Sequence, residues 1–151
     1  MEEVVLERAI QIAVQAHSSQ KEKNGNPYIL HPLRLMMKML GELEMSAAIL
    51  HDVVEDTEWT LEDLRREDFP EAVIEAVDCL THRKQIRYRD YIQRISKNPI
   101  ARKVKIADLE DNLDVKRLPD LTMRDQARMK KYHRAWLLLR NVQRSEAGGF
   151  Q

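Results

Sequence analysis

The amino-acid sequence predicts an all-α protein, organised as a compact single-domain bundle of several helices. Its 151 residues match the length of one domain, and a domain of this length buries roughly 70% of the surface of its unfolded chain. Good helix formers are plentiful, whereas aromatic residues make up 5% and the chain has 4 glycines and 5 prolines. Apolar residues also recur at helical spacing in several segments. These observations favour helices packed on helices.

Two helices are expected in the first forty residues, separated by a loop. Apolar residues recur at helical spacing over residues 4–17 and predict the first helix there. The segment Asn24-Gly25-Asn26-Pro27 then combines residues that favour turns. Pro32 suits the first position of a helix, because its missing N–H costs nothing there, so the second helix should begin beside His31 and continue to Leu40.

Capping signals place the remaining helices. Thr60 and Asp63 have the spacing of a capping box, Thr122 and Asp125 repeat it, and Asn98 followed by proline is typical of a helix start. The expected helices cover residues 45–54, 60–69, 70–80, 88–95, 99–115 and 122–140.

The composition limits the possible partners and locations. Lys and Arg total 25 and Asp and Glu total 25, so no net charge attracts nucleic acid and none is expected as a partner. The N-terminus does not resemble a signal peptide and no apolar stretch is long enough to span a bilayer, which predicts a cytoplasmic protein without membrane contact. The single cysteine, Cys79, excludes an internal disulfide. The domain is expected over residues 1–144, followed by a disordered tail over residues 145–151.

Histidine and aspartate residues mark three separate points of the chain. His31 lies at an expected helix entrance, the doublet His51-Asp52 ends an apolar run, and Asp108 lies on the apolar side of an expected helix. Imidazole nitrogens and carboxylate oxygens are ligands that divalent metals of intermediate softness accept. A bound metal can polarise water for hydrolysis, so this set of residues indicates a hydrolase.

Most of these residues also have a structural interpretation. A lone histidine before a proline is more often a satisfied loop residue than a ligand, Asp52 could cap a helix or form an ion pair, and the following pair Glu55-Asp56 could solvate a loop. Asp108 shares a helix face with apolar residues, where an unpaired carboxylate is costly to bury, so we expect a cation beside it. Taken together, two imidazoles and four carboxylates favour a metal site.

Three segments resemble the signature blocks of a known family. They are His31-Pro32, residues 48–57 with the sequence AILHDVVEDT, and residues 104–108 with the sequence VKIAD. These segments are similar to those of the HD-domain phosphohydrolases, and specifically to the hydrolase domain of RelA/SpoT-type alarmone enzymes and to the stand-alone small alarmone hydrolases. The resemblance implies a helical bundle of the HD-domain type. It also implies one divalent cation, commonly manganese, with iron, cobalt, nickel or zinc as alternatives, bound by His31, His51, Asp52 and Asp108.

The resemblance implies further roles around the metal. Glu55 and Asp56 match an acidic pair that orients and deprotonates the attacking water, with Asp56 as the preferred base. Asn112 matches an asparagine of the nucleotide pocket, and Lys23 matches a lysine in the loop before the metal-binding histidine. A basic loop supplies candidates for contacts to the remaining phosphates, namely Arg83, Lys84 and Arg87.

Two segments depart from the family pattern. Glu22 stands where the family usually has an arginine that packs on guanine, and a carboxylate lacks the cation–π interaction of a guanidinium group. The segment Leu109-Glu110-Asp111 replaces Arg-Leu-His before Asn112. Either Lys21 takes over the contact to the base, or the ligand is a different nucleotide.

The leading hypothesis is therefore a metal-dependent phosphohydrolase that removes the 3′-pyrophosphate from guanosine polyphosphates, ppGpp or pppGpp, to leave GDP or GTP. One alternative is the same chemistry on another nucleotide or small phosphorylated metabolite. A second alternative is a nucleotide-sensing module without catalysis. The sequence contains every expected ligand and the acidic pair, which favours an enzyme.

Overall fold

The computed structural model describes residues 5–148 and confirms the all-α prediction. No β-strand occurs within this range, and no helix in it has both the length and the apolar character needed to cross a bilayer. The helices, in chain order, are α1 (Val5–Ala16), α2 (Leu30–Met37), α3 (Glu42–Leu50), α4 (Val53–Asp56), α5 (Leu61–Arg66), α6 (Glu71–Leu80), α7 (Tyr88–Ser96), α8 (Pro99–Asn112), the 3-10 helix η1 (Val115–Arg117) and α9 (Met123–Gly148).

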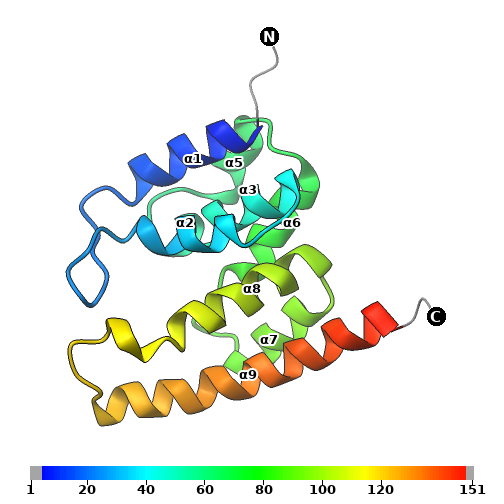
Figure 1. The fold of residues 1–151 in the computed structure, drawn as a ribbon. Helices are drawn as coiled ribbons and strands as arrows, with labels where there is room; N and C mark the ends of the chain where they lie inside the picture. The colour runs from blue at the N-terminus through cyan, green and yellow to red at the C-terminus, as the bar shows by residue number, and fades with distance from the viewer. Residues whose placement is uncertain (1–4, 149–151) are drawn as a thin grey trace.

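Helix α3 forms the centre of the bundle. It packs against α1, α2, α6 and α8, and its residues from Ser46 to Leu50 are fully buried. Ser46, Ala47 and Ala48 are small, so neighbouring helices can approach the α3 backbone closely. In Figure 1, α1 lies on one side of the molecule and the long helix α9 lies on the other, alongside α7 and α8. This arrangement surrounds the C-terminal end of α3 with other helices.

The predicted helix starts are confirmed by their hydrogen bonds. The Thr60 side chain accepts the backbone N–H of Asp63, and the Asp63 carboxylate accepts that of Thr60. Thr122 and Asp125 make the same reciprocal bonds before α9. The Asn98 side-chain oxygen accepts the N–H of Ala101 at 3.0 Å at the start of α8.

Several helix boundaries differ from the prediction: α2 ends at Met37 and not at Leu40, α8 ends at Asn112 and not at residue 115, and larger differences occur at α3 and α9. The helix expected over residues 45–54 is divided, because α3 ends at Leu50 and α4 begins at Val53, so Asp56 ends a helix instead of lying in a loop. Helix α9 continues to Gly148, so residues 145–148, which were predicted to belong to a disordered tail, are helical, and residues 149–151 lie outside the described range. The buried guanidinium of Arg102 explains this extension, since it binds the side chains of Gln143 and Glu146.

Replacement of Asn98 by alanine tests the capping of α8. The variant leaves the Ala101 N–H without its side-chain acceptor, so we expect the free energy of unfolding to fall by about 1 kcal/mol, measured by urea denaturation. Asn141→Ala is the matched control on the exposed surface of α9, where alanine is the better helix former and no loss is expected. Equal losses in both variants would contradict the capping role.

Candidate active site

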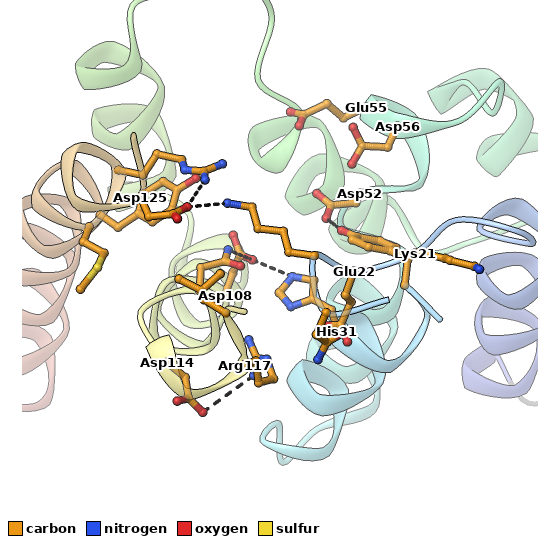
Figure 2. Close-up of a pocket in the computed structure, with 18 of the residues that line it drawn as sticks. Lys21, Glu22, His31, Asp52, Glu55, Asp56, Asp108, Asp114, Arg117 and Asp125 are labelled. Atoms are coloured by element: carbon orange, nitrogen blue, oxygen red, sulfur yellow. Dashed lines mark hydrogen bonds and ion pairs between the residues drawn. The ribbon is translucent and has the colours of Figure 1, made fainter. Parts of the chain in front are cut away.

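The structure brings His31, His51 and Asp108 together in the interior. One ligand atom from each of these buried residues lies within 4.8 Å of the other two. The Nε2 atoms of His31 and His51 lie 2.9 Å and 3.6 Å from Oδ1 of Asp108. Figure 2 shows His31 and Asp108 side by side, on α2 and α8. Two ligand atoms that each lie about 2.1 Å from one ion, with a right angle between the two bonds, are about 3.0 Å apart. The observed spacings therefore fit a shared cation.

Hydrogen bonds fix the orientation of both imidazoles. Nδ1 of His51 lies 2.8 Å from the Ala48 carbonyl oxygen, and Nδ1 of His31 lies 2.6 Å from Oδ2 of Asp111. Both oxygens only accept, so each Nδ1 carries a proton. Nε2 of His31 is then directed toward Asp108, and Nε2 of His51 lies near the carboxylates of Asp52 and Asp108. Nε2 of His51 is buried without a hydrogen-bond partner among the described residues. Because a nitrogen lone pair and a carboxylate repel each other, a proton or a cation belongs between them.

The surrounding carboxylates raise the pKa of both imidazoles. Burial lowers the pKa of His51, but the charges of Asp52 and Asp108 outweigh this effect and raise the pKa well above its usual value. Burial also lowers the pKa of His31, and its hydrogen bonds to Asp108 and Asp111 reverse the shift. In the metal-free protein, protons therefore supply the positive charge that the cluster requires.

Asp52 connects this cluster to a second acidic group. Its Oδ2 lies 3.0 Å from Nε2 of His51 and accepts a hydrogen bond from the Tyr28 hydroxyl. Burial raises the pKa of Asp52, but the adjacent His51 outweighs burial and lowers it to about 2. Carboxylate oxygens of Asp52, Glu55 and Asp56 lie within 4.8 Å of one another, and Figure 2 shows all three on the same side of the cavity.

The second acidic group contains two carboxylates that hold protons more tightly than usual. Burial, followed by the charge of Asp52, raises the pKa of Asp56. Burial also raises the pKa of Glu55, although this carboxylate accepts the backbone N–H of His82 at 2.5 Å. A raised pKa makes each carboxylate a better proton acceptor once it is ionised.

Lys105 is a residue of the site that the sequence analysis missed. Its Nζ lies 2.8 Å from Oδ2 of Asp108, and its side chain is only 12% exposed. It supplies, together with the two imidazoles, the cation expected beside Asp108. Burial lowers the pKa of Lys105, but the charge of Asp108 outweighs it and raises the pKa well above its usual value. The signal was available, because residues three apart share a helix face.

One cavity of about 360 Å³ contains most of the predicted site. The predicted site residues that line it are Lys21, Lys23, His31, Asp52, Glu55, Asp56, Asp108 and Asn112. His51 lies behind this wall, buried against Asp52 and Asp108.

The basic loop predicted to contact phosphates does not border this cavity, because Arg83, Lys84 and Arg87 are not among the residues that line it. Their contact to the phosphates stays a prediction. Arg83 binds Asp78 at 2.7 Å and Arg87 binds Asp90 at 2.9 Å. These ion pairs join the two arginines, which lie between α6 and α7, to carboxylates of those helices.

Other side chains that line the cavity already have partners. Lys23 binds Asp125 of α9 at 2.9 Å, and the Asn112 amide donates to Oδ1 of Asp108 at 3.1 Å. Arg128, which the sequence analysis did not select, also binds Asp125. Lys21 is the cavity-lining lysine or arginine for which no ion pair is found within residues 5–148.

The family model described as HD domain matches residues 9–127. This match covers well over half of the chain. The chain belongs to the HD domain family. HD domains are metal-dependent, and in this one the cluster of His31, His51 and Asp108 could hold the metal.

Similar proteins confirm the resemblance to RelA/SpoT-type enzymes. The HD domain is 39% identical over 122 residues to a GTP pyrophosphokinase of Streptomyces coelicolor, a match that covers 72% of this chain and 14% of the relative. It is 36% identical over 121 residues to a guanosine-3′,5′-bis(diphosphate) 3′-pyrophosphohydrolase of Aquifex aeolicus, covering 72% of this chain and 17% of that protein. The chain therefore spans about one sixth of the length of such relatives.

A solved structure shares the fold of this HD domain. It is described as a metazoan ortholog of SpoT that hydrolyses ppGpp, and it superimposes with a TM-score of 0.74 over 97% of both chains. The sequence identity is 22%, so this likeness establishes the fold alone.

Metal binding by this HD domain should release protons and strengthen as the pH rises. The raised pKa of His51 and of His31 means that protonation stabilises the metal-free protein below pH about 6.5 and that this stabilisation is lost as the pH rises through the folded-state values. A cation must displace these protons, so we expect the affinity for Mn²⁺ to rise by up to about tenfold per pH unit for each proton released.

Calorimetric titration of Mn²⁺ at several pH values, in buffers with different ionisation heats, measures the affinity and the number of protons released. Asp108→Asn should abolish binding, whereas Asp90→Asn, on the exposed surface of α7, should leave it unchanged. Binding that is independent of pH and of the buffer would contradict the proton displacement.

Proposed function

We propose that this HD domain is a metal-dependent phosphohydrolase that removes the 3′-pyrophosphate from ppGpp and pppGpp, leaving GDP or GTP. The observation that carries the proposal is that the histidine–aspartate cluster and the group of Asp52, Glu55 and Asp56 meet at one cavity. The relative from Aquifex aeolicus, named for this reaction, supports the choice of substrate. A cavity of about 360 Å³ falls in the size range of small-molecule binding sites.

We propose Mn²⁺ as the cation, with Fe²⁺, Co²⁺, Ni²⁺ and Zn²⁺ as alternatives that suit the same donors. The residues that would hold it are His31, His51, Asp52 and Asp108, because their free nitrogen and oxygen atoms face one another. A divalent ion bound there supplies Lewis-acid chemistry, since it polarises a phosphoryl oxygen and lowers the pKa of water.

In this proposal, the residues around the cluster manage the proton and the charge. The Asp56 carboxylate accepts the proton that the attacking water loses, a role that suits its raised pKa. Glu55, held by the His82 N–H, orients the water. Lys105 offers its ammonium group to the phosphoryl oxygens from the cavity wall. The water oxygen bonds to the nearer phosphorus of the 3′-diphosphate, the bond to the ribose 3′-oxygen breaks, and that oxygen takes up a proton.

The relatives do not favour either alternative considered from the sequence, another phosphorylated metabolite or a sensor without catalysis. The cytoplasmic location and the lack of a nucleic-acid partner stay predictions.

Product analysis tests the reaction. With Mn²⁺ and ppGpp, the protein should release GDP and pyrophosphate in equal amounts, with no orthophosphate. Asp56→Asn should lower kcat by about 10²–10⁴-fold because it removes the proton acceptor, while Mn²⁺ affinity is largely retained. Glu58→Gln, an exposed charge change outside the cavity, should retain activity. Orthophosphate from other nucleotides would favour the metabolite alternative, and binding without turnover would favour the sensor.

Replacement of basic side chains inside and outside the cavity tests where the phosphates of the substrate bind. Lys21→Met removes a cavity-lining ammonium group that has no ion pair among the described residues, so we expect KM for ppGpp to rise about tenfold in steady-state kinetics. Lys84→Gln combined with Arg87→Gln removes two charges outside the cavity and should leave KM near the wild-type value. The opposite pattern would return the phosphate site to the basic loop.

A further inference from the structure

A chain of charged side chains connects the loop before α2 with the imidazole of His31. Glu22 binds the guanidinium of Arg34, whose Nε lies 2.9 Å from Oδ1 of Asp111. Oδ2 of Asp111 lies 2.6 Å from Nδ1 of His31, and Arg117 also binds Asp111, with Nη1 3.0 Å from Oδ1. This series of charged side chains therefore joins a loop, α2, α8 and η1. Figure 2 shows Glu22, His31 and Arg117 around this end of the cavity.

We propose that Asp111 is a positioning residue for the metal centre, acting through His31. Its carboxylate accepts the Nδ1 proton of His31, which leaves Nε2, directed at Asp108, as the ring nitrogen that can bind a metal. Arg34 and Arg117 hold that carboxylate in place and keep it ionised inside the protein. The inference rests on the metal-dependent function proposed above.

Because the Asp111 carboxylate is buried, it needs charged or hydrogen-bonding partners. Asp111 is only 5% exposed, and an unpaired carboxylate at such a position would be strongly unfavourable. Two guanidinium groups and one imidazole N–H together supply donors to both of its oxygens. A carboxylate that holds the far nitrogen of a metal-binding histidine fixes the ring and makes it more basic, and its loss typically weakens metal binding 10–100-fold.

The same series of charged side chains explains how the site accommodates Glu22 and Asp111, the two acidic residues that depart from the family pattern. Glu22 and Asp111 carry two negative charges, and Arg34 and Arg117 carry two positive charges, so the group is neutral as a whole. The Arg34 guanidinium binds the carboxylates of both Glu22 and Asp111, which leaves no position for a second cation there, although Glu22, His31 and Asp111 lie within 4.8 Å of one another. The Arg34 guanidinium therefore holds Glu22 in this group.

Asp111→Asn tests the proposal on the full chain. The amide keeps the shape of the side chain but cannot hold two guanidinium groups and the imidazole equally well. We expect the dissociation constant for Mn²⁺, measured by electron paramagnetic resonance, to rise by about 10–100-fold. In the Zn²⁺-loaded protein, the Nδ1 proton of His31 should give a strongly deshielded, slowly exchanging NMR resonance, and the variant should lose it.

Asp78→Asn is the matched control. Asp78 also binds two arginines, Arg83 and Arg94, but within residues 5–148 it makes no hydrogen bond or ion pair with an imidazole. This variant removes a carboxylate that is also held by two arginines but does not hold His31, so it should retain the affinity for Mn²⁺ and the His31 resonance.

The outcomes separate the two proposals. Failure of the wild-type protein to bind Mn²⁺ would overturn the metal centre, and this inference with it. Wild-type binding together with unchanged affinity and an unchanged resonance in folded Asp111→Asn would overturn the positioning role alone. Should Asp111→Asn fail to fold, Arg34→Met leaves Asp111 in place but removes one of its supports. That variant should raise the dissociation constant several-fold, and an unchanged value would overturn the inference.

Discussion

One buried carboxylate, that of Asp108, must be balanced by positively charged groups, and this requirement organises both the fold and the site. Asp108 is buried on α8, and an ionised group at that depth costs several kcal/mol unless charged partners meet it. His31 from α2, His51 after α3 and Lys105 from α8 itself provide those partners. Three helices must therefore lie at fixed positions around a single side chain. The same packing meets two requirements. It balances the buried charge of Asp108, and it brings together the side chains that could bind a metal.

The way α3 ends determines what this packing presents to the cavity. Small residues let α3 pass through the middle of the bundle, and the hydrogen bond from His51 to Ala48 closes its last turn. The chain then forms the single turn of α4, which keeps Asp52, Glu55 and Asp56 at spacings of three and four residues and therefore on one face. One short segment thus supplies a buried ligand and, directly beside it, carboxylates in contact with the cavity.

Features set by local chemistry were predictable from the sequence, and features set by distant contacts were not. The caps at Thr60 and Asn98 are local, and so is the doublet His51-Asp52 with its acidic neighbours. The end of α9 depends on Arg102, which lies more than forty residues from its partners in α9. The position of the basic loop outside the cavity was not predictable either, because it depends on how helices distant in sequence pack.

Glu22 and Asp111 illustrate why residues that depart from a family pattern must be interpreted together with their contacts. Taken singly, each adds a negative charge near a position intended for phosphates, and each argues against the family's chemistry. Arg34, twelve residues from one and seventy-seven from the other, binds both and cancels that charge. The proposed metal centre requires a firmly held hydrogen-bond acceptor at Nδ1 of His31, and more than one type of residue can supply it. A change of side chain at this position is therefore compatible with the same chemistry as long as its counter-charge changes with it.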